Sequence, residues 1–160
     1  MDGNSRPRGL VRFFLRFPIF LYRIGLGWLF GDRLVLLTHR GRQSGRQRQV
    51  VVETVRIERA TRTVYILSGW GEQSDWVRNI QRTPAVVVQL GLRRWLAIAV
   101  RLDAAETERE LLEYGRRRPV ALAALAKRYQ IALPEESSIG GNYRPLAHRI
   151  PLFALQAQSQ

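Results

Sequence analysis

The chain has 160 residues, a length that suits one domain with a real core and is too short for two such domains. Its 26 lysines and arginines outnumber 13 acids, which gives a formal net charge of +13, and Lys127 is the only lysine. Because guanidinium groups bind carboxylates and phosphates, this composition favours an anionic partner: a phosphorylated cofactor, a nucleic acid or an acidic membrane surface. The chain has no cysteine, which excludes disulfides, thiolate metal sites and cysteine nucleophiles. It also has only two histidines and no suitably spaced carboxylate pair, so we expect any chemistry to come from a bound cofactor.

Residues 8–30, RGLVRFFLRFPIFLYRIGLGWLF, form the most hydrophobic segment and raise the question of membrane contact. A simple span is disfavoured because Arg12, Arg16 and Arg23 interrupt the apolar run. On a helical wheel the arginines form a basic stripe beside an apolar face, which suits either an anionic bilayer surface or packing against the protein's own core. We expect Pro18 to split this segment in two. Residues 1–33 are therefore assigned as an amphipathic N-terminal segment, and residues 34–160 as the main part of a single domain.

From Leu34 onward the pattern is typical of strands. We predict six of them, in the runs LVLLTH, QVVVETVRIE, TVYILSG, AVVVQL, RWLAIAVRL and RIPLFAL. Turns at Ala60–Thr63 and at Gly91 would join neighbouring strands as hairpins. Helices are predicted from a cap at Ser74 or Asp75 to a point before Pro84, after the helix-capping Asp103, and from Pro119, with a loop over ESSIGGNYR. The fold class is α+β, with six mostly antiparallel strands closing into a small barrel flanked by helices.

The stretch THRGRQSGRQRQ, residues 38–49, places four arginines at the tip of the first hairpin. If Gly41 and Gly45 adopt positive φ angles, successive backbone N–H groups would form a concave nest for an anion. The Ser44 hydroxyl would add a donor, and the arginines at positions 42, 46 and 48 would surround the bound anion. A bound phosphate would then relieve the repulsion among the arginines. The alternative is a flexible hairpin whose arginines are solvated.

Three stretches, LLTHRGRQSGRQR, SGWGEQSDWVRNIQRTP and RIPLFAL, resemble the deazaflavin-dependent nitroreductase family. The resemblance runs from Leu34 to Leu155 and extends to the basic, apolar N-terminal segment. It implies a split β-barrel like those that bind FMN. It also implies an oxidoreductase that transfers a hydride from reduced coenzyme F420, an 8-hydroxy-5-deazaflavin, to a quinone, a nitroaromatic or another electron-poor acceptor.

The resemblance also implies roles for particular residues. The cofactor phosphate would be held by the hairpin residues Arg42, Gln43, Ser44, Gly45 and Arg48, whereas Arg46 matches a variable position. The cofactor would lie along Ser68, Gly69, Trp70 and Gly71, with Trp76 and Asn79 supporting that wall. Relatives commonly carry lysine where this chain has Gln43. No catalytic residue is assigned, and Tyr143 is the candidate on the acceptor side.

Other interpretations stay open from the sequence. The same fold could hold FMN or haem or act as a binding protein without turnover. A basic barrel could also bind nucleic acid by stacking bases on Trp70, Trp76 or Trp95, although these tryptophans do not form a strip on one face. His39 and His148 are expected to be structural or solvent-facing, with no metal site. A monomer or homodimer is expected in the cytoplasm, with peripheral contact to the inner face of the membrane through residues 8–30.

Overall fold

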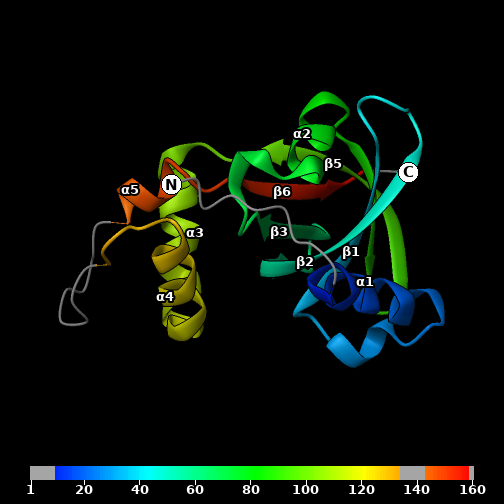
Figure 1. The fold of residues 1–160 in the computed structure, drawn as a ribbon, viewed down its shortest axis with the longest axis horizontal. Helices are drawn as coiled ribbons and strands as arrows, with labels where there is room; N and C mark the ends of the chain where they lie inside the picture. The colour runs from blue at the N-terminus through cyan, green and yellow to red at the C-terminus, as the bar shows by residue number, and fades with distance from the viewer. Residues whose placement is uncertain (1–9, 134–142, 159–160) are drawn as a thin grey trace.

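The computed structural model describes residues 10–133 and 143–158, and its centre is a closed six-stranded barrel (Figure 1). The strands follow the order β1-β2-β3-β6-β5-β4, and β4 pairs with β1 to close the barrel. Every pairing is antiparallel. Their bounds are β1 Leu34–Arg40, β2 Gln47–Glu58, β3 Thr63–Leu67, β4 Ala85–Leu90, β5 Arg93–Arg101 and β6 Leu152–Ala157. The predicted fold class is confirmed.

Alternation along the strands separates the inside of the barrel from the outside. Val52 belongs to the core cluster inside the barrel, and Val50 packs against the same cluster. Val55 belongs instead to a second cluster under the helices, and Glu53 reaches a helix outside the barrel. Odd-numbered positions of this part of β2 therefore face outward, as the two-residue period of a strand requires.

One helix closes an end of the barrel. Helix α2, Asp75–Arg82, contributes the buried side chains of Trp76, Val77 and Ile80 to the core cluster inside the barrel. Trp76 meets Phe153 of β6 edge to face, with ring centroids 6.1 Å apart. The helix is therefore fixed to the barrel by apolar packing, and its remaining side chains are placed relative to the strands.

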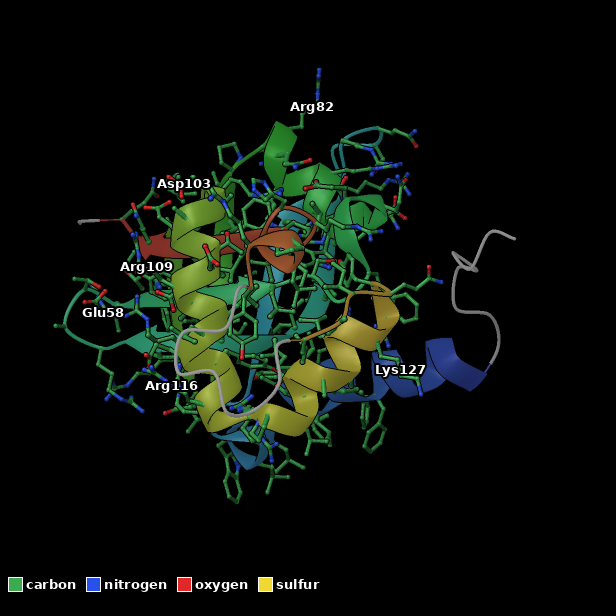
Figure 2. The ribbon with its side chains drawn as sticks, turned by 90° about the vertical axis from the view of Figure 1, so that its left-hand side faces the viewer. Glu58, Arg82, Asp103, Arg109, Arg116 and Lys127 are labelled. Carbon is green, nitrogen blue, oxygen red and sulfur yellow. The ribbon has the colours of Figure 1, made fainter. Side chains whose placement is uncertain are left out.

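A helical layer covers one outer face of the barrel (Figure 2). It consists of α3, Ala104–Arg117, α4, Pro119–Arg128, and α5, Arg144–Ala147, and it packs over a second buried cluster that includes Leu111, Leu122 and Leu125. Helix α3 starts with a capping box, in which Asp103 and Glu106 each accept a hydrogen bond from the other's backbone N–H. Pro119 begins α4, where its missing N–H costs nothing. The predicted cap and start are confirmed.

The N-terminal segment differs from the prediction at Pro18. Helix α1, Leu10–Arg23, continues through this proline, so the expected split at Pro18 is wrong. The helix is terminated instead by Gly25, two residues past its end, whose φ of 79° lets Leu26 N–H donate to Leu21 C=O and Gly25 N–H donate to Tyr22 C=O. A short 3-10 helix, η1 Gly27–Phe30, follows. Within the residues described, no helix is both long and apolar enough to cross a bilayer.

Two further predictions change at the C-terminal end. The final strand begins at Leu152 and not at Arg149, because Ile150 and Pro151 lie between α5 and β6. The predicted loop ESSIGGNYR falls mostly outside the described residues, and its last residue, Arg144, begins α5.

Candidate functional site

A buried amide fastens the arginine hairpin to helix α2. Asn79 is 4% exposed, and its Oδ1 accepts hydrogen bonds from the backbone N–H and from Nη1 of Arg42, both at 3.0 Å. Its Nδ2 lies 3.2 Å from Nδ1 of His39 on β1 and donates to it. One side chain thus connects the first strand, the hairpin loop and the helix. Of the two residues of α2 that the resemblance indicated, Trp76 therefore packs in the core and Asn79 holds the hairpin.

His39 is neutral in this arrangement. Burial lowers its pKa below the ordinary value, and the nearby Arg48 cation lowers it further, while the backbone of Arg40 and the Asp75 carboxylate act in the opposite direction. Because Nδ1 accepts the hydrogen bond from Asn79, the ring proton lies on Nε2. His39 is therefore structural, as predicted, and His148 is exposed.

The hairpin arginines have different surroundings. Arg42 donates to Asp75 Oδ1 at 3.1 Å as well as to Asn79, so its charge is already compensated within the protein. Arg48 is exposed, and its guanidinium has no hydrogen-bond or ion-pair partner among the described residues. Of these two arginines, Arg48 is therefore the one whose guanidinium is available to an external anion.

The backbone of the hairpin loop is only partly available as an anion nest. Gly45 has a φ of 65°, as expected, but Gly41 has no positive φ, so that part of the prediction is wrong. Gly41 N–H donates to Arg46 C=O and Gly45 N–H donates to Gly41 C=O, each at 2.8 Å. The N–H groups of positions 42 and 46 are also used, by Asn79 and by the Ser44 hydroxyl. In the part of the chain described, the N–H groups of Gln43 and Ser44 remain without a protein acceptor.

The loop after β3 is held from inside and from α4. The Ser68 hydroxyl lies 3.1 Å from Gly71 C=O and 2.8 Å from the Ser74 hydroxyl. Tyr129 donates its phenol proton to Ser68 C=O at 3.1 Å, and burial raises the pKa of Tyr129 to about 12, so this donor stays protonated. The backbone of the loop is therefore fixed by hydrogen bonds from two sides.

Trp70 in this loop is stacked beneath an arginine. The Arg128 guanidinium lies 4.1 Å from the centroid of the Trp70 ring and donates to Gly69 C=O at 3.2 Å. The indole is 43% exposed. Trp70 thus presents a supported aromatic surface at the edge of the loop.

Two connected clefts run along these elements. The main cleft has a volume of about 750 Å³ and lies between β2, the loop after β3 and helix α4. The hairpin cleft has a volume of about 380 Å³ and lies between the hairpin loop and α2. Val50, Asp75 and Trp76 line both clefts, so the two form one continuous groove.

The groove gathers most of the predicted residues. Arg42, Gln43, Ser44 and Arg48 line the hairpin cleft, Ser68, Gly69 and Trp70 line the main cleft, Asn79 lines the former, and Trp76 lines both. Gly45 and Gly71 lie in the same loops but do not line either cleft. Tyr143 lies at the start of α5 and packs against the cluster under the helices, outside both clefts.

The far end of the main cleft has a polar group that the sequence analysis did not single out. Glu53 Oε1 accepts a hydrogen bond from the Tyr114 phenol at 3.0 Å and from Nη1 of Arg118 at 2.5 Å. Burial, and next the Glu53 carboxylate, raise the pKa of Tyr114 to about 12. The only hint in the sequence was one acid within a β-branched run, because its partners lie more than sixty residues away.

The closed barrel, with a helix filling one end and a groove along its outer face, defines a split barrel of the flavin-reductase-like class. A family model of the F420H(2)-dependent quinone reductases matches residues 22–134, well over half of the chain. The protein therefore belongs to this family, whose reductant is the reduced deazaflavin coenzyme F420. This confirms the resemblance found in the sequence. A search among curated proteins found no match.

Solved structures agree with this class. An F420-H2 dependent reductase, FDR-A, is 21% identical with a TM-score of 0.55, over 79% of this chain and 96% of its own. A structure described as a domain-swapped dimer has the same identity and score, over 79% of this chain and 81% of its own. HutZ, a heme storage protein from Vibrio cholerae, is 14% identical with a TM-score of 0.53, over 81% and 84%. At these identities the likeness concerns the fold.

Proposed function

We propose that this protein transfers a hydride from reduced coenzyme F420 to a quinone, with nitroaromatics and similar electron-poor compounds as further acceptors. The observation that carries the proposal is the continuous groove, which joins an anion-binding end at the hairpin to a roomier cleft between β2 and α4. The family provides the reductant. The acceptor class rests on the size and mixed apolar lining of the main cleft.

The hairpin cleft suits the phosphodiester and carboxylates of such a cofactor. Arg48 has an uncompensated charge, and the N–H groups of Gln43 and Ser44 are available beside it. Charge-assisted hydrogen bonds to phosphate are among the strongest that a protein makes. Gln43 adds an amide donor where relatives commonly carry lysine, so Arg48 supplies a larger share of the charge.

The remaining groove residues position the reactants. Bound cofactor would supply the hydride. The protein would hold the cofactor against the acceptor and exclude water. The Ser68–Gly71 loop, fixed by Tyr129 and Arg128, forms one rigid wall, and Trp76 forms the floor where the two clefts meet. Reduction of a quinone to a hydroquinone needs one hydride and one proton, and solvent at the open cleft can supply the proton.

Stopped-flow oxidation of reduced F420 tests the proposal. We expect menadione to oxidise the reduced cofactor in the presence of protein much faster than without it, as measured by the recovery of deazaflavin absorbance. A parallel titration with FMN tests the alternative flavin. Tight FMN binding without F420 turnover would contradict the proposal and favour the flavin-binding alternative.

We also propose that the N-terminal face contacts an anionic membrane, where hydrophobic quinones are found. Five large apolar side chains, each about half exposed, project from α1, η1 and the turn between them: Phe17, Phe20, Ile24, Trp28 and Leu29. Arg23 lies beside them and donates to Gln49 of β2. Aromatic groups next to arginines suit the interface of an anionic bilayer.

Vesicle sedimentation tests this contact. We expect binding to phosphatidylglycerol vesicles to exceed binding to phosphatidylcholine vesicles, and Trp28→Glu to reduce it severalfold. Leu96→Glu, at an exposed apolar position on β5 outside this face, serves as the matched control. Equal binding by both variants would contradict the proposal.

A further inference from the structure

The main cleft has one carboxylate at the end away from the hairpin. Two acids line the groove, Asp75 and Glu53. Asp75 lies where the two clefts meet, is 71% exposed, and pairs with Arg42. Glu53 lies farther along β2, and its carboxylate is held by Tyr114 and Arg118. The two acids therefore occupy different parts of the groove.

The distance along β2 separates Glu53 from the hairpin end. Val50 lines both clefts, whereas Glu53 lines only the main cleft. Three residues of strand span about 10 Å, so Glu53 lies about 10 Å beyond Val50, where the two clefts meet. This distance is about the length of one fused ring system. On the α4 side the cleft is lined by Ala121, Ala124 and Leu125, and by Arg128, whose guanidinium donates to Gly69 C=O in the loop after β3. A cofactor anchored at the hairpin leaves this far end for the acceptor.

The far end presents the negative part of the ion pair to the cleft. Glu53 lines the cleft, but Arg118 does not. The Tyr114 phenol is 2% exposed and keeps its proton, so it donates to Glu53 and fixes the side chain in place. An anionic group entering this end of the cleft would meet the fixed Glu53 carboxylate, whose side chain is 39% exposed, and would be repelled by it at short range.

We propose that Glu53 determines the charge selectivity of the acceptor site, admitting neutral acceptors and rejecting anionic ones. The proposal rests on the proposed reductase function and narrows its substrate class to uncharged quinones and nitro compounds. Tyr114 also lines the cleft, and it acts here as a positioning residue because its buried phenol donates to the Glu53 carboxylate and holds it in place.

The test compares Glu53→Gln with the wild type on two quinones of similar ring size. One is menadione, which is neutral, and the other is 1,4-naphthoquinone-2-sulfonate, which is anionic. Glutamine keeps an oxygen that accepts from Tyr114 and Arg118, so we expect a folded variant. The ratio of kcat/KM for the sulfonate to that for menadione should rise about tenfold, the order expected for removing one partly screened unit charge.

A second readout needs no turnover. Trp70 and Trp76 line the main cleft, so quenching of tryptophan fluorescence in cofactor-free protein reports quinone binding. We expect Glu53→Gln to bind the sulfonate about tenfold more tightly and menadione about equally, with the difference shrinking at high salt. Tyr114→Phe should also bind the sulfonate more tightly than the wild type does, but the gain in affinity should be smaller than that of Glu53→Gln.

Glu58→Gln is the matched control, because it makes the same chemical change on the same strand. Glu58 is the last residue of β2 (Figure 2), and it lines neither cleft. Its selectivity should equal that of the wild type. A folded Glu53→Gln with unchanged selectivity in both readouts would overturn the inference. Failure of the wild type to oxidise F420 with menadione would overturn the reductase function, while the binding readout would still decide the role of Glu53.

Discussion

The two ends of the groove differ in how their arginines are compensated. At the hairpin, Arg42 is paired with Asp75 and bound by Asn79, while Arg48 has no partner among the residues described. At the far end, Arg118 is paired with Glu53, and it is the carboxylate that lines the cleft. One end therefore offers a surplus positive charge and the other a negative surface. This difference gives the groove a direction, with anions favoured at the hairpin and neutral groups at the far end.

The largest expected effect comes from removing the Asn79 side chain, which fastens the hairpin to α2. Asn79→Ala removes three hydrogen bonds and leaves the buried Nδ1 of His39 and the partly buried backbone N–H of Arg42 without partners, while the Arg42 guanidinium keeps Asp75. We expect the free energy of unfolding to fall by about 2–3 kcal/mol, because each buried group left unpaired costs about 1–3 kcal/mol. For a chain of this size, the melting temperature should fall by roughly 4–12 °C, measured by calorimetry.

The same variant tests whether the two ends of the groove bind their ligands independently. The hairpin end should lose its affinity for F420, whereas quenching by menadione at the far end should persist in the folded fraction. Gln73→Ala is a suitable control, since Gln73 is an exposed neighbour that lines only the main cleft. Unchanged stability of Asn79→Ala would show that the amide does not fasten the hairpin.

A smaller effect distinguishes the two arginines of the hairpin cleft. Arg48→Ala should weaken F420 binding about 10- to 100-fold, because a charge-assisted hydrogen bond is worth about 1.5–3 kcal/mol. Arg42→Ala should weaken it less and lower the melting temperature more, since that guanidinium is already bound within the protein. Isothermal titration and thermal melts of both variants provide the comparison. The reverse ranking in affinity would contradict the assignment of Arg48 as the available cation.

The smallest effect is a pH dependence confined to the hairpin end. The pKa of His39 is lower in the folded protein than its ordinary value of 6.5, so the unfolded chain binds the proton more readily. Stability is therefore full above about pH 6.5 and decreases as the pH falls below it. We expect a larger loss of stability between pH 7 and 5 in the wild type than in His39→Gln, measured by urea unfolding. Parallel pH profiles for the two proteins would contradict the role of His39.

The sequence predicted the barrel because strand alternation, hairpin turns and helix caps are local signals. The first hairpin, the turn at Gly91 and the capping Asp103 were all found this way. The break predicted at Pro18 is absent, because a single proline is tolerated within α1 and Gly25 terminates the helix. A proline inside a helix costs about 3 kcal/mol, and packing of the helix against the rest of the protein can offset that cost.

The candidate site was predictable only in part. The family resemblance indicated the hairpin and the loop after β3, and the structure brings most of those residues to one groove. It did not indicate that Arg42 would be compensated by Asp75, because this depends on where α2 lies against the barrel. Glu53 was missed for the same reason, since Tyr114 and Arg118 reach it from α3 and its C-terminal end.

Strand β6 has a consequence for synthesis of the chain on the ribosome. It lies between β3 and β5, with Tyr65 opposite Ala154 and Val100 opposite the same residue on the other side. Until this last strand emerges, both neighbours present an unpaired edge, and unpaired edges recruit other strands. We therefore expect truncation before Leu152 to favour aggregation of nascent chains, even though every residue lining the groove has already been made.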